Sequence, residues 1–533
     1  MQTIYQTAKP FDLLLKKQKI AAGQTYRPMY YVVEQPVDEG LLLYHTMTKA
    51  LLLLTPEEAE IYKTNPTALP QLVEQWFLVP QSHDDRLLSR QITDVARMLE
   101  KKTGAITSYT IMTTSDCNAR CFYCFEMGRP RVPMSEETAR RTVDYIIRHS
   151  KGEPVSIMWY GGDPLYNKGI ITFICHLLRE AGIEYKSRMI SNGYLFDDDI
   201  IAEACNLWQL KRVQITLDGT EEVYNRCKAY IYKDVNGYRR VIDNIHRLQK
   251  AGIQVIIRLN IDIHNADNLL ALSKELNREF PDTKGIHVYI HQLFEEEKGR
   301  TAMHHEEKRK VVFSKMQEIR QILAQGGFFN TIKIRRKIKT NYCMADNDNC
   351  IMITPNGNIG KCDHYTHDQF VSHIDSEEWD EDMLQSFREK HNETETCATC
   401  FDYPNCFMLK KCQAALHCFP EIRKDNLDKI RHQIIVTYDS YKKTRGRMNM
   451  KYKIEIAPLS DYYVVVVRDK DNDDLKDTFT INEIGADMLR LFSSGKDKEA
   501  IAKEIASMYE APISVITKDV EKFEDHLRKK DLI

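Results

Sequence analysis

Apolar and polar positions alternate regularly between residues 105 and 295. Short runs rich in β-branched side chains predict strands at 109–113, 155–160, 187–191, 212–217, 254–261 and 286–292. Apolar residues at helical spacing predict intervening helices, for example at 135–149, 197–205 and 238–251. Strands that alternate with helices form parallel sheets with right-handed crossovers. The centre of the chain is therefore predicted to be an α/β unit, closed or partly closed into a barrel, that ends with a helix over 306–324.

Smaller units are predicted at both ends of the chain. The C-terminal pattern predicts strands at 453–456, 462–468 and 478–481, followed by helices at 483–492, 498–509 and 516–529. Residues 28–86 predict a strand pair, 30–33 and 41–54, with two short helices, in an order that loosely echoes the C-terminal unit. A polar helix over 421–443 is predicted to lead into the C-terminal unit.

The length of 533 residues exceeds what one compact core normally holds, since domains usually contain about 100–200 residues. The patterns predict an accessory α+β unit at 1–104, a barrel at 105–335, a cysteine-rich segment at 336–425, a linker at 426–450 and a small winged-helix-like α+β unit at 451–533. Metal must stabilise the cysteine-rich segment, because it shows few long periodic runs.

Charge and hydropathy narrow the class of protein. The formal net charge is −2, so no overall basic field favours a nucleic-acid partner. The first residues lack the pattern of a secretory signal, and the most apolar segments are too short to span a bilayer. A cytoplasmic protein without a membrane or nucleic-acid partner is expected. In that reducing compartment the 14 cysteines indicate metal binding or catalysis rather than disulfides.

Three cysteines lie together after the first predicted barrel strand, as Cys117-Asn-Ala-Arg-Cys121-Phe-Tyr-Cys124. Three thiolates in one loop can bind three irons of a cubane cluster and leave the fourth iron open to another ligand. A zinc site would normally recruit four protein ligands. A cluster is the favoured interpretation, and a structural loop or an incomplete zinc site is the alternative.

This motif resembles the signature of the radical S-adenosylmethionine (SAM) superfamily, in which an aromatic residue precedes the third cysteine. The resemblance implies a [4Fe-4S] cluster whose open iron binds the amino and carboxylate groups of SAM. It places Tyr123 near the adenine. It also implies an electron donor, such as a flavodoxin or ferredoxin, and a 5′-deoxyadenosyl radical that abstracts hydrogen from the substrate, while the protein positions the cofactor.

Further motifs follow the next predicted strands. Gly161-Gly162-Asp163-Pro164 resembles the family turn that binds the methionine amino group, with Asp in place of the usual Glu. Ser191-Asn192 stands where relatives contact the ribose or carboxylate, and Thr216-Leu217-Asp218-Gly219 resembles another family element. Lys228 stands twelve residues after Thr216, where relatives often place an Arg. All are expected at the C-terminal rim of the barrel.

Eight more cysteines follow between residues 343 and 418, enough for two four-iron clusters or two zinc ions. Their spacing resembles the SPASM extension of radical SAM enzymes that act on peptides. The resemblance implies one auxiliary cluster on Cys343, Cys350, Cys362 and Cys412, and another on Cys397, Cys400, Cys406 and Cys418. Asp363 follows Cys362 directly, where sulfatase-maturing relatives place a catalytic base. A hydrogen bond that shapes the ligand loop is the alternative role for Asp363.

Residues 462–533 resemble a peptide-recognition domain related to the peptide chaperone PqqD of pyrroloquinoline-quinone biosynthesis. That family binds a leader peptide by adding a strand to an exposed sheet edge. The alternative is an unrelated winged-helix domain. We therefore expect a maturase that binds a ribosomally made precursor peptide and introduces a thioether or carbon–carbon crosslink. The rival hypotheses are an anaerobic sulfatase maturase, which makes formylglycine, and a non-catalytic zinc-containing adaptor.

Overall fold

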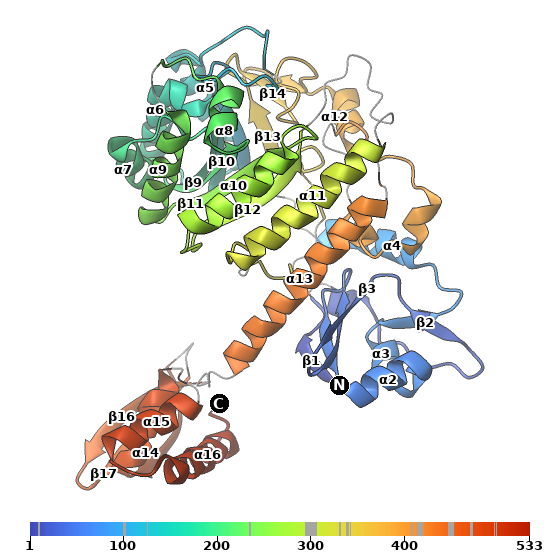
Figure 1. The fold of residues 1–533 in the computed structure, drawn as a ribbon, viewed down its shortest axis with the longest axis vertical. Coiled ribbons are helices and arrows are strands. Elements are labelled where there is room, and N and C mark those ends of the chain that lie inside the picture. Colours follow the sequence, from blue (N-terminus) through green and yellow to red (C-terminus); the bar gives the residue numbers. More distant parts are fainter. Residues whose placement is uncertain are drawn as a thin grey trace. The chain divides into compact units, whose positions relative to one another are not determined.

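The computed structural model describes residues 1–8, 11–99, 103–124, 126–233, 236–293, 306–329, 332–336, 340–341, 343–406, 409–412, 418, 420–445, 452–469, 473–494, 496 and 498–532. The chain divides into two compact units, Met1–His432 and Gln433–Ile533. Figure 1 shows the elements of each unit. The finer division into five segments stays a prediction, and residues 446–450 of the predicted linker lie outside the described part.

The barrel sheet contains six parallel strands in the order in which they occur along the chain. These are β7 (Ser108–Thr114), β8 (Val155–Gly161), β9 (Tyr185–Ser191), β10 (Leu210–Leu217), β11 (Gln254–Ile261) and β12 (Ile286–Gln292). Each strand pairs in parallel with the next, as when Val213 of β10 pairs with Val255 of β11. The predicted open barrel of α/β type is thereby confirmed, with each predicted strand within two residues of its observed bounds.

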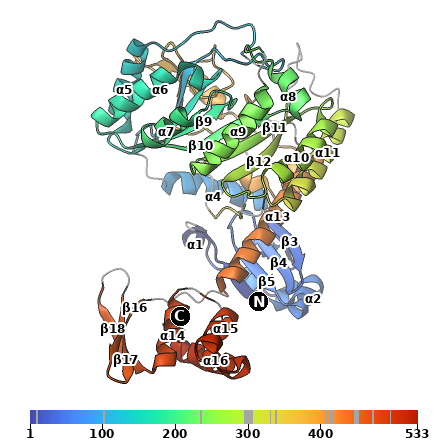
Figure 2. The ribbon, with the colours of Figure 1, turned by 60° about the vertical axis from the view of Figure 1, so that its left-hand side comes forward.

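Helices cover one face of this sheet (Figure 2). They are α5 (Glu136–Ser150), α6 (Lys168–Glu180), α7 (Asp198–Asn206), α8 (Glu221–Lys228), α9 (Gly237–Lys250) and α10 (Ala266–Glu279), followed by α11 (Glu306–Gln325). Side-chain caps begin several of them: the oxygens of Ser135, Asp197 and Asn236 accept hydrogen bonds from the main-chain amide three residues later. Alternate residues of each strand, such as Val213, Ile215 and Leu217, are fully buried beneath the helices.

The barrel sheet continues into the cysteine-rich segment, which the sequence did not predict. Strand β13 (Cys350–Ile353) pairs in parallel with β7, and β14 (Asn358–Gly360) and β15 (Ser372–His373) extend the sheet to nine strands. Gly357 makes the tight β13–β14 turn with φ +86°, a conformation that favours glycine. The other elements of this part of the chain are three short 3-10 helices and two α-helices. They are η2 (Pro164–Asn167), η3 (Glu395–Thr399), η4 (Tyr403–Asn405), α12 (Glu381–Arg388) and α13 (Pro420–Arg445).

The N-terminal segment contains a four-stranded antiparallel sheet in the order β1 (Gln2–Tyr5), β5 (Leu51–Leu54), β4 (Gly40–His45), β3 (Val32–Val37). The predicted single strand over 41–54 is wrong, because a turn at Thr46–Lys49 divides it and places Lys49 at φ +63°. The remaining elements are α1 (Phe11–Leu14), β2 (Tyr26–Pro28), α2 (Pro56–Thr64), η1 (Pro66–Ala68), α3 (Pro70–Glu74), β6 (Leu78–Pro80) and α4 (Asp85–Leu99).

The C-terminal unit contains three antiparallel strands followed by three helices, as the sequence predicts. The strands are β16 (Lys453–Leu459), β17 (Tyr462–Arg468) and β18 (Leu475–Ile481), with β17 in the middle. The helices are α14 (Glu483–Ser493), α15 (Lys498–Met508) and α16 (Ile513–Lys529). Val465, Leu489, Ile505 and Leu527 are fully buried in the core between sheet and helices.

Candidate functional site

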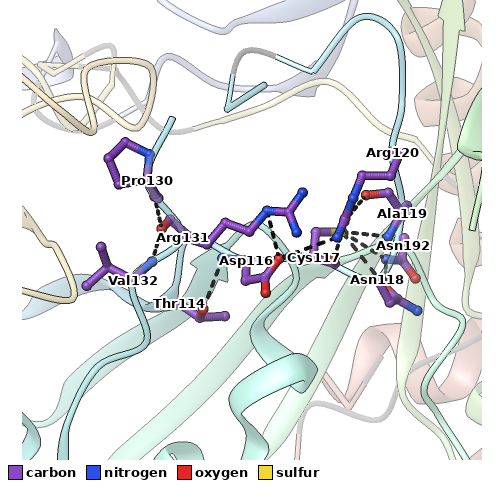
Figure 3. A network of polar contacts seen from close by, with 11 residues as sticks. Thr114, Asp116, Cys117, Asn118, Ala119, Arg120, Pro130, Arg131, Val132 and Asn192 are labelled. Atoms are coloured by element: carbon purple, nitrogen blue, oxygen red, sulfur yellow. Dashed lines mark hydrogen bonds and ion pairs between the residues drawn. The ribbon is translucent and has the colours of Figure 1, made fainter. Parts of the chain in front are cut away.

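The loop after β7 carries Cys117, Cys121 and Cys124 at the C-terminal rim of the barrel. Its first turn is fixed by Asp116, whose amide donates to Thr114 Oγ1 at 3.0 Å and whose Oδ1 accepts the Cys117 amide at 2.8 Å (Figure 3). Arg131 Nε lies 3.4 Å from the same Oδ1, so the returning end of the loop is held to the same carboxylate. The cysteine loop therefore begins in a defined conformation.

The Cys117 thiol lies among hydrogen-bond donors. The main-chain amide of Ala119 lies 3.3 Å from its Sγ, and the side-chain amide of Asn192 lies 3.5 Å from it. Burial raises the pKa of Cys117 to about 12, and burial also raises the pKa of Cys121 and Cys124. Such thiols ionise when a metal supplies positive charge, because a coordinating thiol is deprotonated. The donor set and its surroundings thus fit an iron–sulfur cluster.

The double glycine after β8 is required by a close approach of two loops. A Cβ on Gly161, whose φ is +136°, would lie 2.0 Å from the carbonyl oxygen of Thr114. A Cβ on Gly162 would lie 2.3 Å from the carbonyl oxygen of Asp116. Because main-chain atoms occupy both positions, only glycine fits here. The motif therefore lies directly against the cysteine loop, and Pro164 begins the following turn of 3-10 helix.

Asp163 is fully buried and binds three groups of its own chain. Its Oδ2 accepts the hydroxyl of Ser191 at 2.9 Å and the amide of Asn192 at 2.8 Å, while Oδ1 accepts the amide of Leu165 at 3.0 Å. Burial raises the pKa of Asp163 to about 6, although these hydrogen bonds oppose the shift. Asp163 thus joins the ends of β8 and β9 and orients Asn192 toward Cys117.

Tyr123, Asp218 and Lys228 form a buried cluster beside the same loop. The Tyr123 hydroxyl donates to Asp218 Oδ2 at 2.7 Å, and Lys228 Nζ lies 2.9 Å from that oxygen and 3.1 Å from the hydroxyl. Burial lowers the pKa of Lys228, but Asp218, Tyr123 and Cys121 outweigh it, so the pKa lies well above its usual value. The sequence indicated Tyr123 and Lys228 as cofactor contacts; the structure gives both a partner within the protein.

Two asparagines that sequence analysis missed hold Asp218 in place. Asn260, at the end of β11, donates to Asp218 Oδ1 at 3.1 Å, and Asn265 donates to the Asp218 carbonyl at 3.1 Å. A polar residue that interrupts the apolar run of 254–261 was the available signal for Asn260. Thr216, also indicated by sequence, is half-buried and pairs with Arg258 in the sheet register.

A cavity of about 160 Å³ opens next to this cluster. Its lining includes Tyr123 and Asp218 from the cluster, with Phe122, Asn265 and Leu293. The aromatic and amide groups suit a flat polar ligand beside the cysteine loop.

Asp363 lies on the loop after β14, near the interior of the barrel. Its carbonyl accepts the Tyr160 hydroxyl at 3.3 Å. The pKa of Tyr160 is raised well above its usual value, first by burial and then by the charges of Asp363 and Glu126. Glu126, just beyond the cysteine loop, binds His367 Nε2 at 2.6 Å and the hydroxyl of Thr366 at 2.7 Å. The loop of Asp363 is thus attached to the loop of Cys124.

Four of the later cysteines gather around β13 and β14. Burial raises the pKa of Cys362 to about 12, and the thiols of Cys412 and Cys343 lie close enough to raise it further. Cys350 begins β13, and its carbonyl accepts Lys361 Nζ at 2.6 Å. Cys362 therefore lies near Cys412 and Cys343, and Cys350 lies at the start of β13; the assignment of these four cysteines to one cluster stays a prediction.

The other four cysteines line one larger cavity. Cys397, Cys400, Cys406 and Cys418 all border a cavity of about 530 Å³. Burial raises the pKa of Cys400 to about 11, with smaller contributions from the charges of Asp402, Cys418 and Cys406. Residues of helix α4, among them Arg90 and Arg97, line the same cavity. The N-terminal segment thus contributes to this cysteine site, which sequence analysis did not predict.

The described residues contain no three His, Cys, Asp or Glu side chains arranged to hold a single metal ion. In a mononuclear zinc site every thiolate binds the same ion at about 2.3 Å, whereas in a cubane each cysteine binds a different iron.

No helix within the described ranges is long and apolar enough to cross a membrane.

Two protein families match this chain. Residues 111–296 match the Radical SAM superfamily, and residues 465–533 match the family described as coenzyme PQQ synthesis protein D (PqqD). The first match contains the cysteine loop, the double glycine and the buried Lys228 cluster. The second begins within β17 and contains β18 and the three C-terminal helices.

Curated relatives are similar over parts of the chain. A probable GTP 3′,8-cyclase of Archaeoglobus fulgidus is 27% identical over 36% of this chain and 62% of its own length. The GTP 3′,8-cyclase of Clostridium perfringens is 27% identical over 55% of this chain and 93% of its own. The sporulation killing factor maturation protein of Bacillus subtilis is 22% identical over 31% and 40%.

Solved structures are similar at low identity. The structure titled anSMEcpe with bound AdoMet has a TM-score of 0.47 at 15% identity, over 63% of this chain and 99% of its own. Streptococcus suis SuiB bound to S-adenosylmethionine has a TM-score of 0.40 at 13% identity, over 72% and 95%. The class of enzyme is therefore assigned from the two family matches and not from these structures.

Proposed function

Because this chain contains a radical SAM domain and a C-terminal PqqD domain, it is an enzyme, and we propose that it modifies a ribosomally made precursor peptide. The single observation that carries the proposal is the presence of both domains in one chain. A PqqD unit provides a sheet edge for a peptide, and a radical SAM domain provides chemistry on unactivated C–H bonds. We propose an oxidative crosslink, either a thioether or a carbon–carbon bond, as the modification.

We propose that Cys117, Cys121 and Cys124 hold a [4Fe-4S] cluster and that SAM binds beside it. When bound, this pair supplies a carbon radical able to abstract hydrogen. The main chain at Gly161, Gly162 and Pro164 forms one wall for the cofactor, with Asp163 holding Ser191 and Asn192 in place. Tyr123 belongs to the cysteine loop after β7, Thr216 lies near the end of β10, and Lys228 is the last residue of α8.

The Lys228 cluster is buried beside the cysteine loop, and its opposite charges compensate one another. Its buried ammonium is paired with Asp218, and its charge favours ionisation of the Cys121 thiol. An exposed Arg could instead reach a ligand with a bidentate fork, which the compact ammonium of Lys cannot form. We therefore propose that Lys228 fixes the positions of Tyr123 and Asp218, besides contacting the cofactor.

We propose that the later cysteines hold two auxiliary [4Fe-4S] clusters. One set is Cys343, Cys350, Cys362 and Cys412; the other is Cys397, Cys400, Cys406 and Cys418. The cavity bordered by the second set and the charge effects among Cys343, Cys362 and Cys412 of the first set support these groupings. Asp363 adjoins the first set and the barrel interior, so we propose that it accepts a proton from the peptide.

The C-terminal unit has two edge strands on which a leader peptide can pair. β16 and β18 each pair only with β17 within the described part of the unit. Exposed apolar side chains such as Leu475, Tyr462 and Val515 offer contacts for the apolar residues of a leader. We further propose a cytoplasmic location and a flavodoxin or ferredoxin as the electron donor.

The direct test is to co-express the chain anaerobically with the shortest reading frame beside its gene and to measure the exact mass of that peptide. We expect a loss of two hydrogens for each crosslink, abolished by Cys117→Ala. Cys205→Ala is the matched control, because Cys205 lies on α7 outside all three cysteine sets. An unchanged peptide mass with the wild-type chain contradicts the proposed crosslink.

Two further readouts separate the rival functions. An aldehyde on the peptide that reacts with a hydrazide would identify a formylglycine-generating enzyme, since oxidation of Ser also removes two hydrogens. Zinc in place of iron after anaerobic purification, with no cleavage of SAM by the reduced chain, would identify a non-catalytic adaptor.

A further inference from the structure

The turn between β4 and β5 is bonded to the loop that carries Cys400 and Cys406. The hydroxyl of Thr46 donates to the carbonyl of Phe401 at 2.5 Å, and Lys49 Nζ donates to Asn405 Oδ1 at 2.7 Å. Thr46 and Lys49 are both buried. Buried polar groups that pair across a contact are costly to separate, because each partner would lose its hydrogen bond without gaining water. The turn is thus hydrogen-bonded at two points to the loop that carries Cys400 and Cys406.

The same loop also packs into the apolar core of the N-terminal segment. The ring of Tyr403 stacks on that of Tyr31, with centroids 6.3 Å apart and planes inclined by 6°. Tyr403 belongs to the periphery of the apolar cluster that includes Tyr31, Met47 and Ile92. Its hydroxyl donates to Glu393, which forms an ion pair with Arg86 of α4 at 3.1 Å. The loop that carries Cys400 and Cys406 therefore packs against the same apolar cluster as the N-terminal segment.

Helix α4 forms part of the wall of the cavity bordered by Cys397, Cys400, Cys406 and Cys418. Ser89, Arg90, Thr93, Asp94 and Arg97 line it. Arg97 Nε also donates to the carbonyl of Thr340 at 2.9 Å, which attaches the helix to the start of the cysteine-rich segment. Both guanidinium groups are paired with carboxylates of the same lining, Arg90 with Glu393 at 3.8 Å and Arg97 with Asp94 at 3.6 Å.

We propose that the N-terminal segment is the structural support of the second auxiliary cysteine site. The β4–β5 turn and Tyr31 hold the ligand loop, and α4 supplies the cavity wall with two guanidinium groups. This inference rests on the proposed function, in which Cys397, Cys400, Cys406 and Cys418 hold a four-iron cluster. Thr46 is thus a positioning residue that acts through the main chain of the loop that carries Cys400 and Cys406. Lys49 and Tyr31 act through the side chains of Asn405 and Tyr403 of the same loop.

One sheet edge of the N-terminal segment is covered by the start of the chain itself. Like the C-terminal unit, it has three consecutive antiparallel strands followed directly by a side-chain-capped helix, here β3–β5 and α2. Its third strand, β5, is already paired on both sides, with β4 and with β1 from the start of the chain. The corresponding strand β18 pairs only with β17 in the described C-terminal residues. The chain itself therefore occupies one of the two corresponding edges, whereas β3, which corresponds to β16, pairs only with β4 among the described residues.

The test uses Lys49→Met, which keeps the length of the side chain but removes its hydrogen bonds, and Asn405→Ala from the other side of the contact. Lys17→Met is the matched control, because Lys17 is 82% exposed and pairs only loosely with Glu74 in the same segment. Iron and sulfide are measured per full-length chain after anaerobic reconstitution. With three four-iron clusters, the wild type and Lys17→Met should hold about twelve irons, and the two variants about eight.

A second measurement follows alkylation of each cysteine in the iron-free chain by peptide mapping. Both variants should accelerate alkylation of the half-buried Cys397 and Cys400 by about tenfold or more, and leave Cys117 and Cys343 unchanged. Equal acceleration at all fourteen cysteines would mean general unfolding and would overturn the local role.

The outcomes separate this inference from the function on which it rests. About twelve irons in both variants, with unchanged alkylation, would overturn the support role while leaving the auxiliary clusters intact. About four irons in the wild type itself would instead remove the auxiliary clusters from the proposed function.

Discussion

Lys228 Nζ lies 2.9 Å from Asp218 Oδ2, and these side chains are only 4% and 1% exposed. The pair joins the last residue of α8 to the loop after β10, and both partners bind the hydroxyl of Tyr123 in the cysteine loop. A buried ion pair is tolerated only when its remaining polar groups are satisfied, and Asn260 satisfies the second oxygen of Asp218. The cluster therefore couples the cysteine loop to two barrel strands.

Replacing Lys228 by Met should strongly destabilise the barrel. The variant leaves the Asp218 carboxylate buried without its counter-ion, which typically costs about 3–5 kcal/mol of unfolding free energy. Urea unfolding of the iron-free chain at neutral pH measures the loss. Arg226→Met is the control, because its ion pair with Glu222 is largely exposed and should contribute less than about 1 kcal/mol. Equal losses of unfolding free energy in Lys228→Met and Arg226→Met would show that the buried ion pair contributes no more stability than the exposed one.

Asp163 predicts a pH dependence of stability with a definite sign. Burial raises its pKa from 3.8 to about 6, so between these values the folded chain binds the proton more tightly than the unfolded chain. Its contribution to stability is therefore present at low pH and is lost as the pH rises through about 6. Relative to Asp163→Asn, the wild type should lose about 2 kcal/mol of unfolding free energy between pH 4 and pH 6, out of about 3 kcal/mol over the whole titration.

Urea unfolding of the iron-free chain at several pH values gives this difference. Asp198→Asn serves as the comparison, because Asp198 is 86% exposed and should leave the pH dependence unchanged. A difference between wild type and Asp163→Asn that stays constant, or grows with pH, would contradict the raised pKa.

The two roles considered for Asp363 give different results in Asp363→Asn. If the carboxylate accepts a proton from the peptide, the variant should keep its full iron content and its SAM cleavage but form crosslinked peptide at least about a hundredfold more slowly. If it only shapes the ligand loop after Cys362, iron content should fall instead. Peptide mass, 5′-deoxyadenosine and iron are measured on the same sample, with Asp368→Asn on the exposed part of that loop as control.

Removal of residues 452–533 should separate peptide capture from radical chemistry. These residues include all three strands of the C-terminal sheet, whereas the barrel and its cysteine loop belong to the other compact unit. The truncated chain should still cleave SAM but bind the leader peptide at least about a hundredfold more weakly in fluorescence anisotropy. Undiminished leader binding would place the recognition site elsewhere.

Hydrogen exchange of the full chain can then locate the edge used by the leader. Added main-chain hydrogen bonds should slow exchange along β16 or β18, and β17 should change little because it is paired on both sides. No slowing on either edge strand would exclude strand addition.

The local signals in the sequence were sufficient to predict the barrel and its rim. The apolar run 254–261 coincides with β11, and Cys117, Gly161, Ser191 and Asp218 all follow or end their strands as expected. Alternation along a strand and capping at a helix start depend on neighbouring residues, so one sequence contains them in full. The same local reading failed at 41–54, where the apolar pattern continues through the turn at Thr46–Lys49.

Only the tertiary structure decided which distant groups meet. The sequence alone determined the three-cysteine loop, the order of the barrel strands and the strand-then-helix pattern of the C-terminal unit. It did not show that β13 pairs with β7, that Lys228 is buried against Asp218, or that Thr46 binds Phe401, 355 residues away. Such contacts leave no periodic trace along the chain, because they depend on how separately formed elements pack together.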